Sequence, residues 1–172
     1  MLVYQDLLTA DELLDNSFPI NKELVDGVLW EVEGKWVTKE PVKVDVAVNR
    51  PADKGDPDFS VHDEPKKVID VVDTFQLQEK SVVTDDATLV DTVKKYVDNL
   101  TPKVSADRQA HIKKNFHAAI KYLSGKVKDR KLYVGESMKD ECAPVFCYYK
   151  EGTTNPTFVY FADGQPKAEL AD

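Results

Sequence analysis

The sequence has few of the residue types on which nucleophilic or metal-dependent catalysis depends. Its 172 residues include only two cysteines, Cys142 and Cys147, and three histidines. A zinc site needs about four sulfur or imidazole ligands at close spacing, and His62, His111 and His117 do not complete one. The sequence also lacks a glycine-rich phosphate loop, a dinucleotide-binding fingerprint, a serine elbow and a histidine pair on a glutamate-bearing helix. These absences indicate a protein that is not an enzyme and requires no cofactor.

Neither a disulfide bond nor a membrane span is expected. The two cysteines lie five residues apart in a strand-like stretch, so their side chains would point to opposite faces. The longest apolar run, residues 143–149, is far shorter than the roughly 18 residues of a membrane-spanning helix. The first six residues lack the basic and apolar regions of a secretory signal. We therefore expect a cytoplasmic protein with no membrane partner.

The order of the expected elements predicts the fold class. Strand-like patterns precede two helix-like segments and also follow them, over residues 1–6, 28–38, 68–73, 75–78, 131–134, 143–149 and 157–161. This is the order of an α+β protein, and the length suits a single domain over residues 1–172. Two local features are also predicted, namely a hairpin turn at Gly34 and a capping box from Thr9 to Glu12.

Residues 40–67 are predicted to form a long flexible acidic loop. Four prolines, Gly55 and a group of acidic residues interrupt both helical and strand periodicity there. Asp53, Asp56 and Asp58 offer the hard oxygen ligands that calcium prefers, but the segment lacks the twelve-residue ligand schedule and terminal glutamate of an EF-hand. The alternatives are a weak calcium site and a hydrated acidic loop without one.

Residues 84–128 are predicted to form an antiparallel helical hairpin. Thr84 and Ser105 are suitable N-caps for its two helices, and the short connection between the helices forces them antiparallel. Apolar residues recur at helical spacing in both: Leu89, Val93, Tyr96, Val97 and Leu100, then Ile112, Phe116, Ala119, Ile120 and Leu123.

The basic residues are concentrated in and just after this hairpin. Residues 91–131 carry eleven basic and four acidic side chains, a balance of +7 in a chain whose net charge is −8. Such a dipolar molecule is suited to contact with acidic surfaces, and the outward lysines Lys94, Lys113, Lys114 and Lys121 are the candidates for that contact. The alternative is a solvated helical face that contributes only solubility. Nucleic acid is an unlikely partner, because the acidic remainder would repel phosphates and no aromatic-lined binding motif is present.

Short segments in a fixed order along the whole chain match a known pattern. They are residues 3–6, 11–12, 26–27, 31–35, 70–72, 77–79, 132–136, 143–149 and 161–164. Together they resemble the translationally controlled tumour protein family. The resemblance implies a single β-tent-like domain of mixed sheets, with a projecting antiparallel helical hairpin and a long flexible acidic loop.

The resemblance also implies functions and partners. The family is cytosolic, associated with calcium and with microtubules, growth-promoting and anti-apoptotic, and it is linked to nucleotide exchange on a Ras-like small GTPase. Glu12 matches the family position that engages the GTPase. Gly135 and Glu136 belong to the family signature, for which a packing role is favoured over catalysis.

Three hypotheses follow from the residues and the resemblance together. The leading one is a non-enzymatic binding protein with several partners, among them tubulin through its acidic tails, a Ras-like small GTPase and apoptosis regulators. The first alternative is a guanine-nucleotide exchange factor or regulator for the GTPase. The second is a weak calcium buffer.

Overall fold

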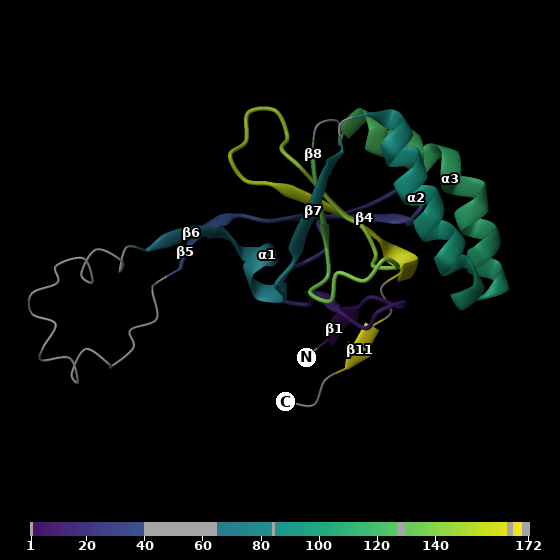
Figure 1. The fold of residues 1–172 in the computed structure, drawn as a ribbon, viewed down its shortest axis with the longest axis horizontal. Helices are drawn as coiled ribbons and strands as arrows, with labels where there is room; N and C mark the ends of the chain where they lie inside the picture. The colour runs from purple at the N-terminus through teal and green to yellow at the C-terminus, as the bar shows by residue number, and fades with distance from the viewer. Residues whose placement is uncertain (1, 40–64, 84, 127–129, 165–166, 170–172) are drawn as a thin grey trace, which may run out of the picture.

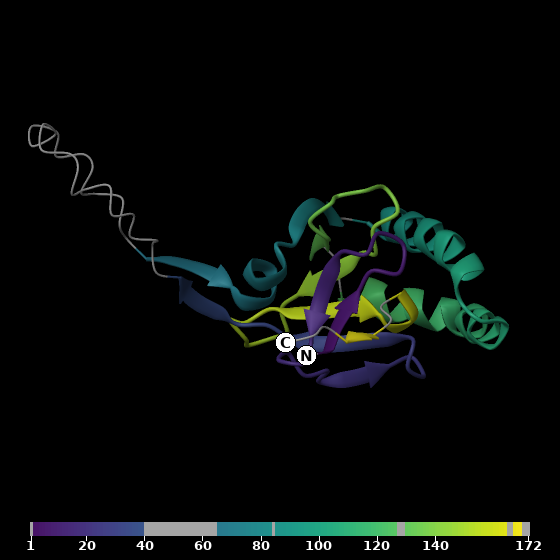
Figure 2. The same ribbon diagram turned by 90° about the horizontal axis from the view of Figure 1, so that it is seen from below.

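Among the described residues, three antiparallel β-sheets and a helical hairpin make up the fold (Figures 1 and 2). The structure is a computed structural model and describes residues 2–39, 65–83, 85–126, 130–164 and 167–169. Its strands are β1 (Leu2–Gln5), β2 (Glu12–Asp15), β3 (Lys22–Leu24), β4 (Leu29–Glu33), β5 (Trp36–Lys39), β6 (Lys66–Ile69), β7 (Gln78–Val83), β8 (Arg130–Val134), β9 (Val145–Tyr148), β10 (Thr157–Phe161) and β11 (Lys167–Glu169). Its α-helices are α1 (Asp70–Phe75), α2 (Asp86–Leu100) and α3 (Ala106–Lys126). The predicted α+β fold class is confirmed.

A six-stranded sheet in the order β3-β4-β10-β9-β8-β7 forms the centre of the molecule. Every residue of β9 and β10 is buried, so both faces of these strands are covered. Neighbouring residues of β10 show what covers them, because side chains alternate between faces along a strand. The Tyr160 hydroxyl donates to the Leu13 carbonyl of β2 (3.0 Å), while the Phe161 ring packs on Tyr96 of α2 (5.4 Å between centroids). The sheet therefore lies between the smaller β11-β1-β2 sheet and the helical hairpin.

The hairpin predicted to turn at Gly34 is wrong, because β4 and β5 belong to different sheets. Strand β4 pairs with β10, whereas β5 pairs with β6 in a two-stranded ribbon that extends from the body (Figure 1). Gly34 lies where the chain passes from one sheet to the other, and a Cβ there would come within 2.7 Å of the Phe158 ring. Close packing rather than turn geometry therefore requires glycine at this position.

The strand predicted over residues 68–73 is wrong beyond Ile69, because α1 begins at Asp70. The Asp70 carboxylate accepts hydrogen bonds from the backbone N–H groups of Lys35 (2.9 Å) and Val71 (2.7 Å), which stabilises this switch from strand to helix. The predicted loop over residues 40–67 also ends earlier than expected, since β6 begins at Lys66. Residues 40–64 of that loop lie outside the described residues.

The helical hairpin forms as its apolar pattern predicts. All five apolar α2 residues expected in the core are buried; in α3, Ile112, Ala119 and Leu123 are buried and Phe116 and Ile120 are half-buried against the core. The N-cap of α2 is Asp85, whose carboxylate accepts from the Thr88 N–H (2.7 Å); the predicted cap, Thr84, lies outside the described residues. No helix in the described part of the chain has the length and apolar character needed to cross a membrane.

The predicted capping box at Thr9 is wrong, because Glu12 is the first residue of β2 and no helix begins there. Thr9 instead donates its hydroxyl to the Asp11 carboxylate (3.0 Å). Two backbone hydrogen bonds close the turn, from the Asp6 N–H to the Asp11 carbonyl and from the Ala10 N–H to the Asp6 carbonyl (both 2.7 Å). We call residues 6–11 the N-terminal turn.

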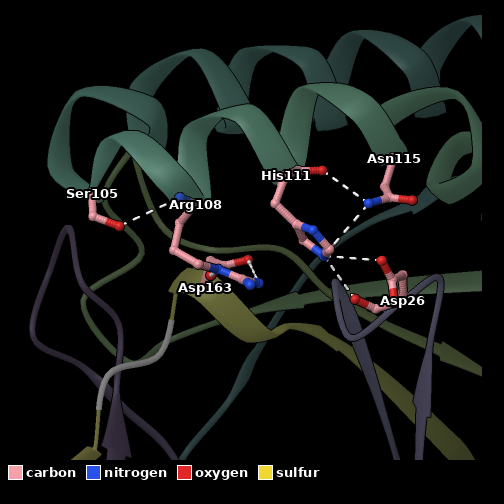
Figure 3. A network of polar contacts seen from close by, with 6 residues as sticks. All are labelled: Asp26, Ser105, Arg108, His111, Asn115 and Asp163. Atoms are coloured by element: carbon pink, nitrogen blue, oxygen red, sulfur yellow. Dashed lines mark hydrogen bonds and ion pairs between the residues drawn. The ribbon is translucent and has the colours of Figure 1, made fainter.

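Polar side chains on one side of α3 fasten it to the strand connections beneath (Figure 3). Arg108 donates through Nε and Nη2 to the two carboxylate oxygens of Asp163, at 2.6 and 2.9 Å. This bidentate contact raises the pKa of Arg108. One turn further along α3, Nε2 of His111 lies 2.7 Å from the Asp26 carbonyl oxygen. Both contacts fix which side of α3 faces the body of the protein.

A buried carboxylate provides a third attachment between α3 and the central sheet. Glu31 of β4 is 2% exposed and accepts hydrogen bonds from Tyr122 of α3 (3.0 Å), Tyr148 of β9 (2.9 Å) and the Lys150 ammonium (2.7 Å). Burial alone would raise the pKa of Glu31, but these three hydrogen bonds outweigh burial and hold the pKa below its ordinary value. Glu31 is therefore an ionised group at the junction of helix and sheet.

Candidate functional site

The side of α3 that faces away from the sheets is rich in lysine. Lys113, Lys114, His117 and Lys121 are all exposed, and their spacing places them on the side opposite the residues that contact the body. The one acidic residue of α3, Asp107, lies in its first turn, and residues 108–126 contain no aspartate or glutamate. We call this side, with its three lysines, the α3 cationic face. Such a surface attracts acidic polypeptides at long range.

Lys94, the fourth lysine proposed from the sequence, has a different local environment. It is exposed on α2, but Asp91 lies three residues before it and Asp98 four residues after it, on the same side of the helix. Residues three and four apart on a helix are neighbours, so both carboxylates reduce the positive potential at Lys94. The structure thus separates Lys94 from the three lysines of α3.

A cavity of about 330 Å³ brings together two other residues proposed from the sequence, Glu12 and Glu136. Both are exposed, Glu12 at the start of β2 and Glu136 just after β8. The remaining lining residues come from the end of β1, the N-terminal turn, and the end of α1 with its C-cap: Gln5, Ala10, Asp11, Thr74, Phe75 and Gln76. We call this the Glu12 cavity. Its lining includes carboxylates, amides, a threonine hydroxyl and one aromatic ring.

Asp11 connects the two sides of this cavity. Its Oδ2 atom accepts hydrogen bonds from the hydroxyls of Thr9 (3.0 Å) and Ser137 (2.6 Å). Gly135 is buried against it, and a Cβ at Gly135 would collide with the Asp11 carboxylate. The glycine of the family signature therefore allows the β8–β9 connection to approach the N-terminal turn, which is a packing role.

A second aspartate, Asp6, is buried and binds the other end of the β8–β9 connection. It is 1% exposed, and its carboxylate accepts from the backbone N–H groups of Ala143 (2.7 Å) and Leu8 (2.9 Å). Burial raises the pKa of Asp6, although both hydrogen bonds act in the opposite direction. Asp6 and Asp11 thus attach the residues before and after the β8–β9 turn to the N-terminal turn.

The remaining sequence-based site residues are not assembled into a site. Asp53, Asp56 and Asp58 lie outside the described residues. In the part of the chain that the structure describes, no three His, Cys, Asp or Glu side chains are placed to hold a metal ion. Cys142 and Cys147 are both buried and do not form a disulfide bond with each other. Cys142 precedes β9 and does not lie on a strand, so the strand spacing is not the reason that the two cysteines are not bonded to each other.

Sequence reasoning did not identify Arg108, Asp163, Glu31 or Asp11 as organising residues. Arg108 was counted among the cations of the hairpin, but its charge is paired with Asp163. Three of these residues, Glu31, Asp11 and Asp163, lie within the segments that resemble the family, and this resemblance is the feature of the sequence that could have pointed to them. Their partners are distant in sequence, so periodicity and spacing could not reveal the contacts.

The fold and its surfaces together define a class: an α+β domain of mixed sheets and a helical hairpin, with a lysine-rich helix face and a small polar cavity. Comparison with known proteins makes the family explicit. The family model for translationally controlled tumour protein matches residues 1–165, and the chain belongs to the translationally controlled tumour protein family.

Two solved structures of the family share the fold. The translationally controlled tumor-associated protein p23fyp of Schizosaccharomyces pombe is 24% identical, with a TM-score of 0.74 over 99% of this chain and 100% of that one. The translationally controlled tumor protein of Caenorhabditis elegans is 26% identical, with a TM-score of 0.61 over the whole of both chains. The family predicted from the sequence is thereby confirmed.

Proposed function

We propose that this protein is a non-enzymatic binding protein of the cytoplasm that engages acidic partners through the α3 cationic face. The observation that carries the proposal is the arrangement of Lys113, Lys114, His117 and Lys121 on one exposed side of a helix whose other side is fastened to the body. A surface held in this way is available without unfolding, and its helical backbone loses little freedom when a partner binds. The acidic tails of tubulin are the partner that the family resemblance suggests.

Co-sedimentation with microtubules tests this proposal. Reversing Lys113, Lys114 and Lys121 to glutamate should abolish binding, because the change removes three positive charges and introduces three negative ones. Binding of the unchanged protein should weaken as salt is raised, since the Debye length is about 10 Å at 0.1 M ionic strength and about 3 Å at 1 M.

Lys94→Glu is the matched control, because Lys94 already lies between two aspartates. It should reduce binding much less than reversal of any one α3 lysine. If the triple variant sediments as the unchanged protein does at low salt, the α3 cationic face is only a solvated surface.

A second function is favoured by the Glu12 cavity, namely regulation of nucleotide exchange on a Ras-like small GTPase. Glu12 is exposed at the start of β2, beside a cavity that also presents Glu136. An exchange factor acts by disturbing the nucleotide and magnesium site of its GTPase, and a carboxylate can do this without being part of a catalytic constellation. Because Glu12 is exposed and lines this cavity, its carboxylate is accessible to a partner.

Release of a fluorescent nucleotide from the GTPase measures this second function. Glu12→Gln should slow stimulated release and leave the melting temperature unchanged, because the side chain is exposed and starts a strand. Glu23→Gln is the control, since Glu23 is also exposed, on β3, but does not line the Glu12 cavity. Equal release rates for the Glu12 and Glu23 variants would remove Glu12 from the interface.

The other proposed roles rest on the family resemblance. These are weak calcium binding or buffering at Asp53, Asp56 and Asp58, contact with apoptosis regulators, and the growth-promoting and anti-apoptotic effects. Titration of calcium into the full chain and into an Asp53→Asn, Asp56→Asn, Asp58→Asn variant tests the first of them. Equal affinities would place any calcium site elsewhere.

A further inference from the structure

Ser137 is placed where a protein kinase could modify it and where a phosphate would have a structural effect. It lies in the β8–β9 connection, in which residues 136–141 are all exposed. Asp140 and Glu141 follow it at the third and fourth positions. Charge patterns of this kind around the acceptor hydroxyl are how kinases select substrates, and acidic residues at these positions suit an acidophilic enzyme.

The structure distinguishes Ser137 from other hydroxyls with the same spacing to an acidic residue. In the described ranges, Thr9 and Thr88 also have an acidic residue three positions later. Thr88 is inside helix α2, where helical hydrogen bonds hold the backbone. Thr9 is half-buried, and its acidic residue, Glu12, already belongs to strand β2. Of these three sites, only Ser137 lies with its acidic residues in one exposed connection outside helices and strands.

We propose that Ser137 is a phosphorylation site for an acidophilic serine/threonine kinase, and that the phosphate releases the β8–β9 connection from the N-terminal turn. In the reaction, the Ser137 Oγ attacks the γ-phosphorus of ATP and an O–P bond forms. The bond between the γ-phosphorus and the β–γ bridging oxygen breaks, ADP leaves, and the hydroxyl proton passes to the catalytic base of the kinase.

The consequence follows from what the Ser137 hydroxyl does in the unmodified protein. It donates to Asp11 Oδ2 at 2.6 Å, and Gly135 permits this close approach. In the phosphate ester the serine oxygen no longer carries a proton to donate, and the group adds about −1.5 to −2 charges beside the Asp11 carboxylate. Like-charge repulsion then replaces a charge-assisted hydrogen bond. Since Asp11 and Glu136 both line the Glu12 cavity, the wall of that cavity changes with the modification.

Treatment of the full chain with an acidophilic kinase and magnesium ATP, followed by mass spectrometry, tests the modification itself. Ser60 has the same downstream spacing and lies outside the described residues, so the reaction is also run on a Ser60→Ala variant. We expect phosphate on Ser137 in both proteins, and a rate about tenfold lower in an Asp140→Asn, Glu141→Gln variant, which loses two charge-assisted contacts with the kinase. Absence of phosphate at Ser137 in the Ser60→Ala variant overturns the proposal, as does an unchanged rate in the double variant.

Hydrogen exchange at the amides of Asp6 and Ala10 tests the structural consequence, because these amides close the N-terminal turn. In the phosphorylated protein they should exchange about tenfold faster, equivalent to ~1.4 kcal/mol of local stability. The Ser137→Ala variant loses the hydrogen bond without gaining charge, and its exchange should be faster than that of the unmodified protein but slower than that of the phosphoprotein. Equal exchange in the phosphorylated and unmodified proteins refutes release of the turn.

Discussion

Replacing Glu31 by glutamine should weaken the attachment of α3 to the central sheet. The carboxylate accepts hydrogen bonds from Tyr148 (2.9 Å), Tyr122 (3.0 Å) and Lys150 (2.7 Å). Hydrogen bonds to charged groups contribute about 1.5–3 kcal/mol each, but they are not additive and glutamine keeps one carbonyl acceptor. The Lys150 side chain is 38% exposed, so solvent screens its contribution. We therefore expect a loss of ~3 kcal/mol, the lower end of the range for breaking a buried charge pair.

Urea unfolding followed by tryptophan fluorescence measures this loss, with a fall in melting temperature of about 6–12 °C as a second reading for a domain of this size. Glu33→Gln is the matched control. Glu33 is 58% exposed and lies 3.6 Å from the same ammonium group, so its loss should be about 0–1 kcal/mol. A Glu31→Gln variant no less stable than Glu33→Gln would refute the view that Glu31 joins helix and sheet.

Three further outcomes are expected. Gly135→Ala should lower the free energy of unfolding in urea by about 1–3 kcal/mol, because the new Cβ would meet the Asp11 carboxylate. Gly125→Ala is the control and should be neutral or stabilising, because a Cβ there would meet no neighbouring atom within 4 Å. Equal losses in the two variants would contradict the packing role of Gly135. Arg108→Met and Asp163→Asn should each lower the free energy of unfolding, and the double variant should lose less than the sum of the two single losses. Losses that add strictly would mean that the bidentate contact contributes nothing to stability. The difference in unfolding free energy between the unchanged protein and Glu31→Gln should be greatest above about pH 5 and shrink as pH falls, because the pKa of Glu31 is lower in the folded state and the unfolded state therefore binds more protons. Asp6, whose raised pKa has the opposite effect, is present in both proteins and cancels in this difference. A difference that does not change with pH would contradict the lowered pKa of Glu31.

The parts of the fold that the sequence predicts are those with long periodic patterns. Both helices of the hairpin follow from apolar residues at helical spacing, and the buried β9 and β10 follow from continuous apolar runs. Short segments are harder. The stretch from Val68 to Asp73 has strand-like patterning, yet helix α1 begins at Asp70. The Asp70 carboxylate accepts a hydrogen bond from the N–H of Lys35, a residue distant in sequence, so the local pattern does not show this contact.

The candidate site shows the same division. The positive charge of α3 can be predicted from the sequence, because no aspartate or glutamate lies between Lys113 and Lys121. The difference between Lys94 and the α3 lysines follows only after the helix faces are assigned. The Glu12 cavity depends on tertiary packing, since Glu12 and Glu136 come from opposite ends of the chain and meet through Asp11 and Gly135.

Direct binding of a fluorescent glutamate-rich peptide, followed by anisotropy over a series of salt concentrations, tests the central claim that the α3 cationic face binds acidic polypeptides. The account predicts affinity that falls steadily as salt rises, nearly unchanged affinity in Lys94→Glu, and no binding in the Lys113→Glu, Lys114→Glu, Lys121→Glu variant. Binding of the triple variant with the affinity and salt dependence of the unchanged protein would contradict it.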